Sequence, residues 1–236
     1  MNALSASAGN VLATFSSPRE AFAFAKQRPG LWWAPIALLL LASTAFWLYF
    51  FATVDAAWLV NSELSQMGDR MPPEITAQVK ALMTPRMMLF QALTVPVITL
   101  GIKLSAVAAY LQLVAKLSGD TKTRFGQWLS LVAWSCVPLL VGLAGQALHV
   151  LWSTTGHVEP DKLSVTTLAS VTGASVSSGW LQQLFDYDLV KLWSLALLVI
   201  GVSVYQSLPL RHAALVVLTP WLLFLLARVA AAGLIS

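Results

Sequence analysis

The sequence predicts an all-α fold, a multi-pass transmembrane helical bundle of five spans with short amphipathic helices at the membrane interface. Charged residues make up 10% of the 236, against about 25% in soluble domains, and hydrophobic residues make up 58%. The mean hydropathy is +0.74. The apolar residues are gathered in long runs, and runs of about 18 or more are typical of membrane helices.

Five apolar runs are long enough to cross the hydrocarbon layer at about 1.5 Å per residue. The predicted spans are 31–54, 88–115, 126–151, 189–208 and 212–234. The last two runs are together too long for one helix, and Pro209 marks the break because proline has no backbone N–H to donate. The chain therefore divides into an N-terminal segment, 1–30, and a five-span membrane domain, 31–236.

The distribution of Lys and Arg predicts how the chain is oriented. Seven of these cations lie in the N-terminal segment and in the loops after spans two and four, and five lie in or beside the other two loops. Because short cytoplasmic loops are enriched in Lys and Arg, we expect the N-terminus in the cytoplasm and the C-terminus outside. The outer loops are then 55–87 and 152–188.

A short helix before the first span is predicted from the run SSPREAFAFAKQR at 16–28. Ser17 precedes Pro18 at a first helical position, and Glu20 follows Ser17 by three residues, which is a capping-box pattern. Phe22 and Ala25 share one face while the cations lie on the other. This pattern favours a helix that lies on the cytoplasmic leaflet.

The outer loops contain two further features. Residues 72–83 place apolar side chains on one stripe, which predicts an amphipathic helix on the outer side or an extension of the second span. The loop at 153–188 is rich in Ser and Thr, and it is interpreted either as a flexible spacer or as a loop that docks a partner.

The turn between spans two and three, AKLSGDTKTRFG at 115–126, interrupts the apolar sequence with charge. Its cations are expected to hold the ends of both spans at the cytoplasmic surface, and its first glycine is expected to terminate the second helix. The candidate partner-facing residues of this turn are Lys116, Gly119, Asp120, Lys122 and Arg124.

Lys103 is the main candidate for an intramembrane polar site because it lies near the middle of the second span. A charge at that depth costs about 2.5–3.5 kcal/mol on insertion scales. The other predicted spans carry no Asp or Glu at comparable depth, so the sequence supports neither a proton relay nor a buried ion pair. Two interpretations stay open: Lys103 extends along its own helix to the interface, or it lies in a polar cavity.

Four other residues join Lys103 in the candidate site. Arg228 lies nearer the outer end of the fifth span, from which it can reach the interface. Pro96, Pro138 and Pro220 interrupt spans two, three and five, and each leaves the carbonyl four residues earlier without its helical partner. Such kinks are common in membrane helices, and in transporters they open cavities.

Signatures of enzymes and cofactors are weak, so we expect no enzyme activity and no cofactor. There is no phosphate-binding loop, and the single Cys136 lies in an apolar run. His149 and His157 lie eight residues apart with no third ligand nearby, which indicates no metal site. Ser175, in GASVSSG, lies in a polar loop rather than on a strand-to-helix elbow, and it is a weak candidate nucleophile.

Three segments of the chain resemble the Yip (Ypt-interacting protein) domain family of five-span membrane proteins, in its bacterial branch. They are SSPREAFAF, AKLSGDTKTRFGQWLSLVAWSCVPLL and LWSLALLVIGVSVYQSLPLRHAALVVLTPW. The positions that carry the likeness are Gly119, Phe125, Ser135, Pro138, Trp193, Gly201 and Ala213. The resemblance implies a compact five-helix domain in a bacterial inner membrane with a cytoplasmic N-terminus. Eukaryotic relatives bind prenylated small GTPases, and that role is not carried over because the segment before the first span is short here.

Three functions stay open from the sequence. The first is a non-enzymatic accessory subunit of a membrane complex, with a membrane protein such as an ABC-type exporter or adaptor as partner. The second is a small-molecule or ion transporter or channel that uses a polar cavity near Lys103. The third is an intramembrane hydrolase that uses Ser175 with His149 or His157. The bilayer is an expected partner in each case, and nucleic acid is not, because the cations follow the membrane topology.

Overall fold

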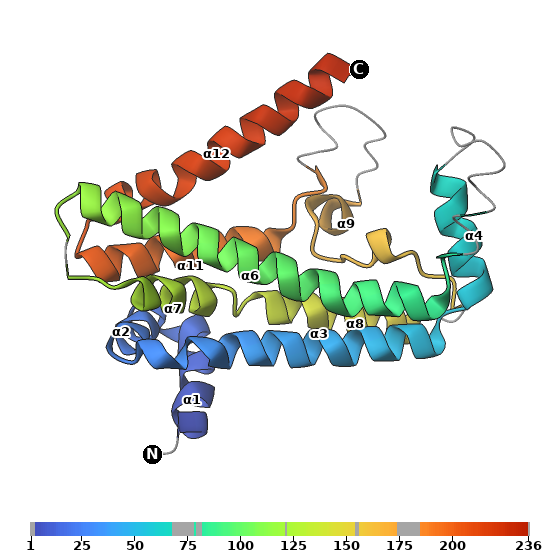
Figure 1. Cartoon of the computed structure of the whole chain (residues 1–236), viewed down its shortest axis with the longest axis horizontal. Coiled ribbons are helices and arrows are strands. Elements are labelled where there is room, and N and C mark those ends of the chain that lie inside the picture. The colour runs from blue at the N-terminus through green and yellow to red at the C-terminus, as the bar shows by residue number, and fades with distance from the viewer. Residues whose placement is uncertain are drawn as a thin grey trace.

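The computed structural model describes residues 3–67, 78, 82–120, 122–153, 156–173 and 185–235, which form helices and connecting turns with no strand among them (Figure 1). The α-helices are α1 (Ala3–Ser16), α2 (Pro18–Gln27), α3 (Trp33–Thr53), α4 (Ala56–Met67), α6 (Pro85–Leu117), α7 (Phe125–Ser135), α8 (Leu139–Trp152), α9 (Leu168–Thr172), α11 (Leu189–Gln206) and α12 (Leu210–Ile235). Short 3₁₀ turns occur at Pro29–Trp32 and Pro160–Lys162. The predicted all-α fold is confirmed.

Five stretches within the described residues are long and apolar enough to cross a membrane. They are Pro29–Thr53, Pro85–Leu117, Phe125–Trp152, Leu189–Gln206 and Leu210–Arg228. The second is longer than predicted because Pro85 occupies the first helical turn and the Thr84 hydroxyl accepts a hydrogen bond from the Met87 N–H, at 3.3 Å. The predicted break at Pro209 is confirmed, since α11 ends at Gln206 and α12 begins at Leu210.

The connections between spans gather at two ends of the bundle (Figure 1). At one end, which we call the α2 end, the Gln206 amide donates a hydrogen bond to the Asp120 carboxylate, at 2.8 Å. At the other, the α4 end, the Asp55 N–H donates to the Gly156 carbonyl oxygen, at 3.2 Å. The loops therefore alternate as the sequence predicted, and the assignment of the α2 end to the cytoplasm stays a prediction.

The third predicted span, 126–151, is not one kinked helix but two helices, α7 and α8. Proline at 138 stops the α-helical ladder, and the chain makes a tighter turn over Cys136–Val137–Pro138. The Trp134 carbonyl oxygen, which was expected to lack a partner, accepts from the Val137 N–H at 3.3 Å. A 3₁₀-type bond thus satisfies the backbone where the sequence predicted an orphan group.

The core lies at the α2 end, where α2, α6, α7 and α11 meet. Phe22 and Leu131 are fully buried there, next to Gly201 of α11. A Cβ atom on Gly201 would lie 2.8 Å from a Leu131 methyl carbon and 3.2 Å from the Phe22 ring. Only a glycine lets these three helices approach so closely.

The N-terminal helices correct two predictions. The apolar face of α2 is covered by protein rather than by the leaflet, because α2 folds back on the bundle and packs against α7 and α11. Its Lys26 ammonium donates to the Tyr205 carbonyl oxygen, at 2.6 Å. The predicted capping box is wrong: Ser17 is the N-cap, but its side chain makes no capping bond. The uncharged helix α1 was not predicted, and it buries Asn10 and Thr14.

Most of the predicted outer helix at 72–83 lies outside the described residues, as does Ser175. The parts of the second outer loop that the structure describes, 156–173 and 185–188, return to the bundle and contact the start of α11.

Candidate functional site

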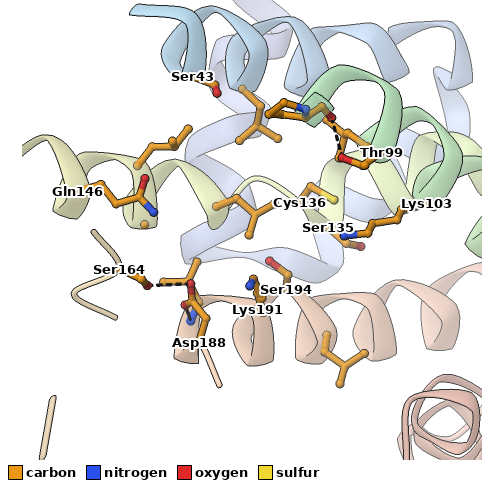
Figure 2. A pocket seen from close by; sticks show the side chains of 18 of the residues that line it. Ser43, Thr99, Lys103, Ser135, Cys136, Gln146, Ser164, Asp188, Lys191 and Ser194 are labelled. Atoms are coloured by element: carbon orange, nitrogen blue, oxygen red, sulfur yellow. Dashed lines mark hydrogen bonds between the residues drawn. The ribbon is translucent and has the colours of Figure 1, made fainter. Parts of the chain in front are cut away.

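A cavity of about 1060 Å³ lies between α3, α6, α8 and α11, and it extends to the segment 162–170 at the α4 end (Figure 2). Leucine is the most frequent residue in its lining. The floor, toward the α2 end, is formed by residues such as Val132, Ser135 and Leu198, beside the tightly packed core. The cavity therefore reaches the loop segment at the α4 end, which we call its mouth, and ends at the packed core toward the α2 end.

Lys103 lines this cavity from the middle of α6. Figure 2 shows its side chain extending from α6 toward the break between α7 and α8, where Ser135 and Cys136 lie. Its ammonium forms no ion pair or hydrogen bond with the described part of the chain. Of the two interpretations left open by the sequence, the placement of Lys103 in a polar cavity agrees with this arrangement.

Polar side chains from all four wall helices share this lack of a partner. They are Ser43 of α3, Lys103 of α6, Gln146 of α8 and Ser194 of α11. None of the four makes a side-chain hydrogen bond with any described residue, and the Ser194 hydroxyl oxygen is completely buried. A polar group without a partner at membrane depth costs on the order of a few kcal/mol.

Two other hydroxyl groups on the wall of the cavity, those of Ser135 and Thr99, bond as isolated membrane hydroxyls usually do. Ser135 donates to the Leu131 carbonyl oxygen at 2.8 Å, and Thr99 donates to the Val95 carbonyl oxygen at 2.8 Å. These bonds lie within one helix and leave little capacity for a ligand. Ser135 and Thr99 are thus hydrogen-bonded to the backbone of their own helix, whereas Ser43 and Ser194 are not.

Asp188 lies at the mouth of the cavity, at the α4 end, and its hydrogen bonds hold this region together. As the N-cap of α11, its carboxylate accepts from the Val190 N–H at 2.9 Å, from the Thr166 hydroxyl at 2.9 Å and from the Ser164 hydroxyl at 3.4 Å. Asp188 was not predicted as a site residue, although an Asp directly before an apolar run is a signature of a helix start. The bonds from Thr166 and Ser164 fix the loop segment against α11, and the bond from Val190 caps the helix.

The fifth span is joined to the same mouth. The Trp221 indole N–H of α12 donates to the Tyr187 hydroxyl in a short hydrogen bond, and the two rings meet edge to face at 5.5 Å. Tyr187 also lines the cavity. Helix α12 thus contacts the cavity mouth through Trp221, the residue after Pro220.

A family model described as the Yip1 domain matches residues 12–231. This chain belongs to the Yip1 domain family. The matched region begins within α1 and ends within α12, so it contains all five spans and every wall of the cavity. Together with the five apolar helices, it identifies a multi-pass membrane protein. No curated protein and no solved structure matches the chain.

The other predicted intramembrane residues of this Yip1 domain divide into two groups. Pro96 lines the cavity, and Pro138 lies between the lining residues Cys136 and Leu139 at the helix break. Pro220 and Arg228 lie on α12 and do not line the cavity. The structure therefore brings Lys103 together with two of the three prolines.

The turn at the α2 end of the Yip1 domain contains the five predicted partner-facing residues. Gly119 ends α6 with φ +88°, as predicted. Asp120 is turned inward: the Thr123 hydroxyl donates to its carboxylate and, with the Lys122 N–H and the Gln206 amide, holds the pKa of Asp120 below its ordinary value. The exposed residues of the turn include Lys116, Lys122 and Arg124.

The two histidines considered for a hydrolase line a smaller hollow of about 420 Å³ at the α4 end. His157 stacks on Trp58 with the ring centres 4.8 Å apart, and Glu159 is paired with Lys162 at 2.6 Å. Within the described ranges, no three His, Cys, Asp or Glu residues are placed to hold a metal ion. The hydrolase hypothesis rests on Ser175 and stays a hypothesis.

Proposed function

We propose that this Yip1-domain protein is a non-enzymatic membrane protein that binds a small molecule in the cavity at Lys103. The observation that carries the proposal is that four helices each direct a polar side chain without a described partner to one cavity. Small-molecule sites are typically cavities of roughly 300–1,000 Å³ with apolar walls and a few polar groups that orient the ligand. A ligand that satisfies these groups removes the cost of leaving them unpaired.

Binding is favoured over continuous conduction because the floor of the cavity abuts the packed core. Phe22, Leu131 and Trp134 are fully buried at the α2 end, and the close approach at Gly201 leaves no space between α7 and α11. A path across the membrane would require these side chains to separate. Transport, the alternative function, therefore needs a second conformation in which the α2 end opens.

The residues of the cavity support a binding role rather than catalysis. Its lining includes serines and Cys136 but no histidine that would activate them. The Ser135 hydroxyl is already donated to a backbone carbonyl. Away from the charged residues at the mouth, a ligand held here meets hydrogen-bond donors and the Lys103 ammonium, which are groups suited to bind an acceptor.

The proposal is tested by filling the cavity. The variant Ser43→Phe places a ring on the cavity side of α3, and Leu41→Phe places the same ring on the same helix at a side chain that is 69% exposed. Purified proteins are incubated with a total membrane lipid extract, and retained small molecules are identified by mass spectrometry. We expect retention by the wild type and by Leu41→Phe, and its loss in Ser43→Phe. Equal retention by both variants would contradict the proposal.

A second candidate function, an accessory subunit of a membrane complex, is supported by the position of α12. This helix diverges from α6 and α11 toward its C-terminal end (Figure 1), and its Leu223 and Phe224 are exposed. Purification from native membranes in a mild detergent should then recover a second membrane protein in stoichiometric amount. A chain that always elutes alone would count against this role and leave the binding role unaffected.

A further inference from the structure

We infer that the ligand of the cavity is an amphiphile, an acidic group on an alkyl chain, whose carboxylate or phosphate binds the Lys103 ammonium. This inference rests on the proposed function, since it names the chemistry of the molecule that the cavity holds. It follows from the charge at the floor of the cavity, from the hydroxyl donor beside it and from the apolar walls.

Charge is distributed unequally along the cavity. Four of the charged lining residues, Lys162, Asp186, Asp188 and Lys191, belong to the loop and the first turn of α11 at the mouth. The Asp188 oxygens already accept three hydrogen bonds, and Lys162 is paired with Glu159. Lys103 lies away from them in the middle of α6. An ammonium at that depth with no described carboxylate partner favours an anionic ligand.

One of the polar groups without partners matches such an anion. The Ser194 hydroxyl can donate a hydrogen bond, and it reaches the cavity from α11, on a wall other than that of Lys103. Figure 2 shows Gln146 of α8 at the opposite side of the cavity from Lys103, so its amide is left out of the anion site. A carboxylate or phosphate has several acceptor oxygens, so one group can accept from donors on different walls. Hydrogen bonds to a charged group are about twice as strong as neutral ones.

The apolar walls indicate the chemistry of the rest of the ligand. Leu39, Leu100, Leu143 and Leu195 line the space around the polar groups. A small hydrated anion would lose its water against these side chains and gain few contacts in return, whereas an alkyl chain gains roughly 0.8 kcal/mol for each methylene it buries. An acid joined to an alkyl chain satisfies both kinds of surface.

The test measures binding to the purified full chain in a neutral detergent. The probes are palmitate, phosphatidylglycerol, a neutral monoacylglycerol and inorganic phosphate, each competing with a fluorescent fatty acid. Lys103→Gln is expected to weaken the binding of an acidic amphiphile roughly tenfold or more, and to leave the monoacylglycerol unchanged. Lys116→Gln, an exposed lysine of the same helix at the α2 end, is the matched control and should bind as the wild type does.

The probes separate the outcomes. Tighter binding of palmitate or of phosphatidylglycerol supports the inference and identifies the free acid or the lipid as the source of the acidic group. If inorganic phosphate competes as strongly as the acidic amphiphiles, the inference that the ligand needs an alkyl chain is overturned. Equal binding of neutral and acidic amphiphiles, unaffected by Lys103→Gln, overturns the inference and leaves the proposed function standing. No binding of any probe, in protein that remains folded, overturns the inference, and the retention of small molecules from the lipid extract then decides the proposed function separately.

Folding of the variants is not expected to limit the test. Lys103→Gln removes a charge from the middle of a span, which lowers the cost of membrane insertion. Ser194→Ala is a second variant that removes one donor and no packing, and it should weaken acid binding by a smaller factor, roughly threefold to tenfold.

Discussion

At the α2 end of the bundle, α7 buries seven of its eleven residues, whereas α8, which continues the same span toward the α4 end, buries two of its fourteen. The two helices have similar apolar composition and are separated by one turn at Pro138. The difference lies in their neighbours. Helix α7 is covered by α2, α6 and α11. Helix α8 contacts α3 and α11, and it lines the cavity with residues such as Gly142 and Leu143. Its exposed side chains, such as Leu148 and Trp152, do not line the cavity.

A membrane protein can thus pack one half of a helix bundle tightly and leave a cavity in the other half. Lipid tails are as apolar as leucine, so helices associate through close packing rather than through burial of apolar surface from water. The α2 end has such packing at Gly201. The α4 end is held instead by hydrogen bonds at the cavity mouth, centred on Asp188, which fix the rim without filling the interior.

The largest effect is expected from Gly201→Ala in the packed half. The added methyl group would lie 2.8 Å from Leu131 and 3.2 Å from Phe22, so these two buried side chains or their helices must shift, at a cost of about 1–3 kcal/mol. Gly101→Ala on α6 is the control, because no side chain or neighbouring helix lies within 4 Å of its added carbon. Thermal unfolding in detergent measures both. Similar melting temperatures for the two variants would show that the α2 end is not tightly packed.

A smaller and more local effect is expected from Asp188→Ala in the hollow half. The variant loses the N-cap of α11 and its bonds to Thr166 and Ser164, for a cost of about 1–2 kcal/mol. Amide hydrogen exchange should increase in segment 164–168 and in the first turn of α11, and should stay unchanged in α7. Asp186→Ala, which removes a neighbouring acid without a capping role, is the control. Faster exchange in α7 would contradict the separation of the two halves.

The smallest effect is a dependence of stability on pH at the α2 end. Hydrogen bonds, first from the Thr123 hydroxyl, lower the pKa of Asp120 below its ordinary 3.8. The unfolded chain therefore binds this proton more readily, so the stability that Asp120 contributes is present above pH 3.8 and is lost as pH falls through the lowered pKa. Thr123→Ala should reduce this loss, measured as melting temperature against pH. A pH profile identical to that of the wild type would contradict the role of Thr123.

The sequence predicted the five spans because apolar length and Pro209 are direct signals. It also indicated Lys103 as a candidate site residue, since a charge in the middle of a span is rare and costly, and the structure places Lys103 on the cavity wall. It did not predict Ser43, Gln146 or Ser194 as members of the same site. An isolated serine in a membrane helix usually bonds to the preceding turn, as Ser135 does, and only the positions of the four helices reveal which hydroxyls do not.

The face of α2 was predicted correctly and its surroundings were not. Phe22 and Ala25 share a face, but protein and lipid present the same kind of apolar surface to that face, so its pattern does not distinguish them. The close approach at Gly201 is a property of three helices together. No single segment of the sequence indicates it.

The contact between α2 and α11 has a consequence for biosynthesis. Lys26 leaves the ribosome before the first span, yet the carbonyl to which it donates belongs to Tyr205, 179 residues later. A nascent chain that has inserted only three spans therefore has no α11 to cover Phe22. The helix that emerges early reaches its final position late, after the fourth span has entered the membrane.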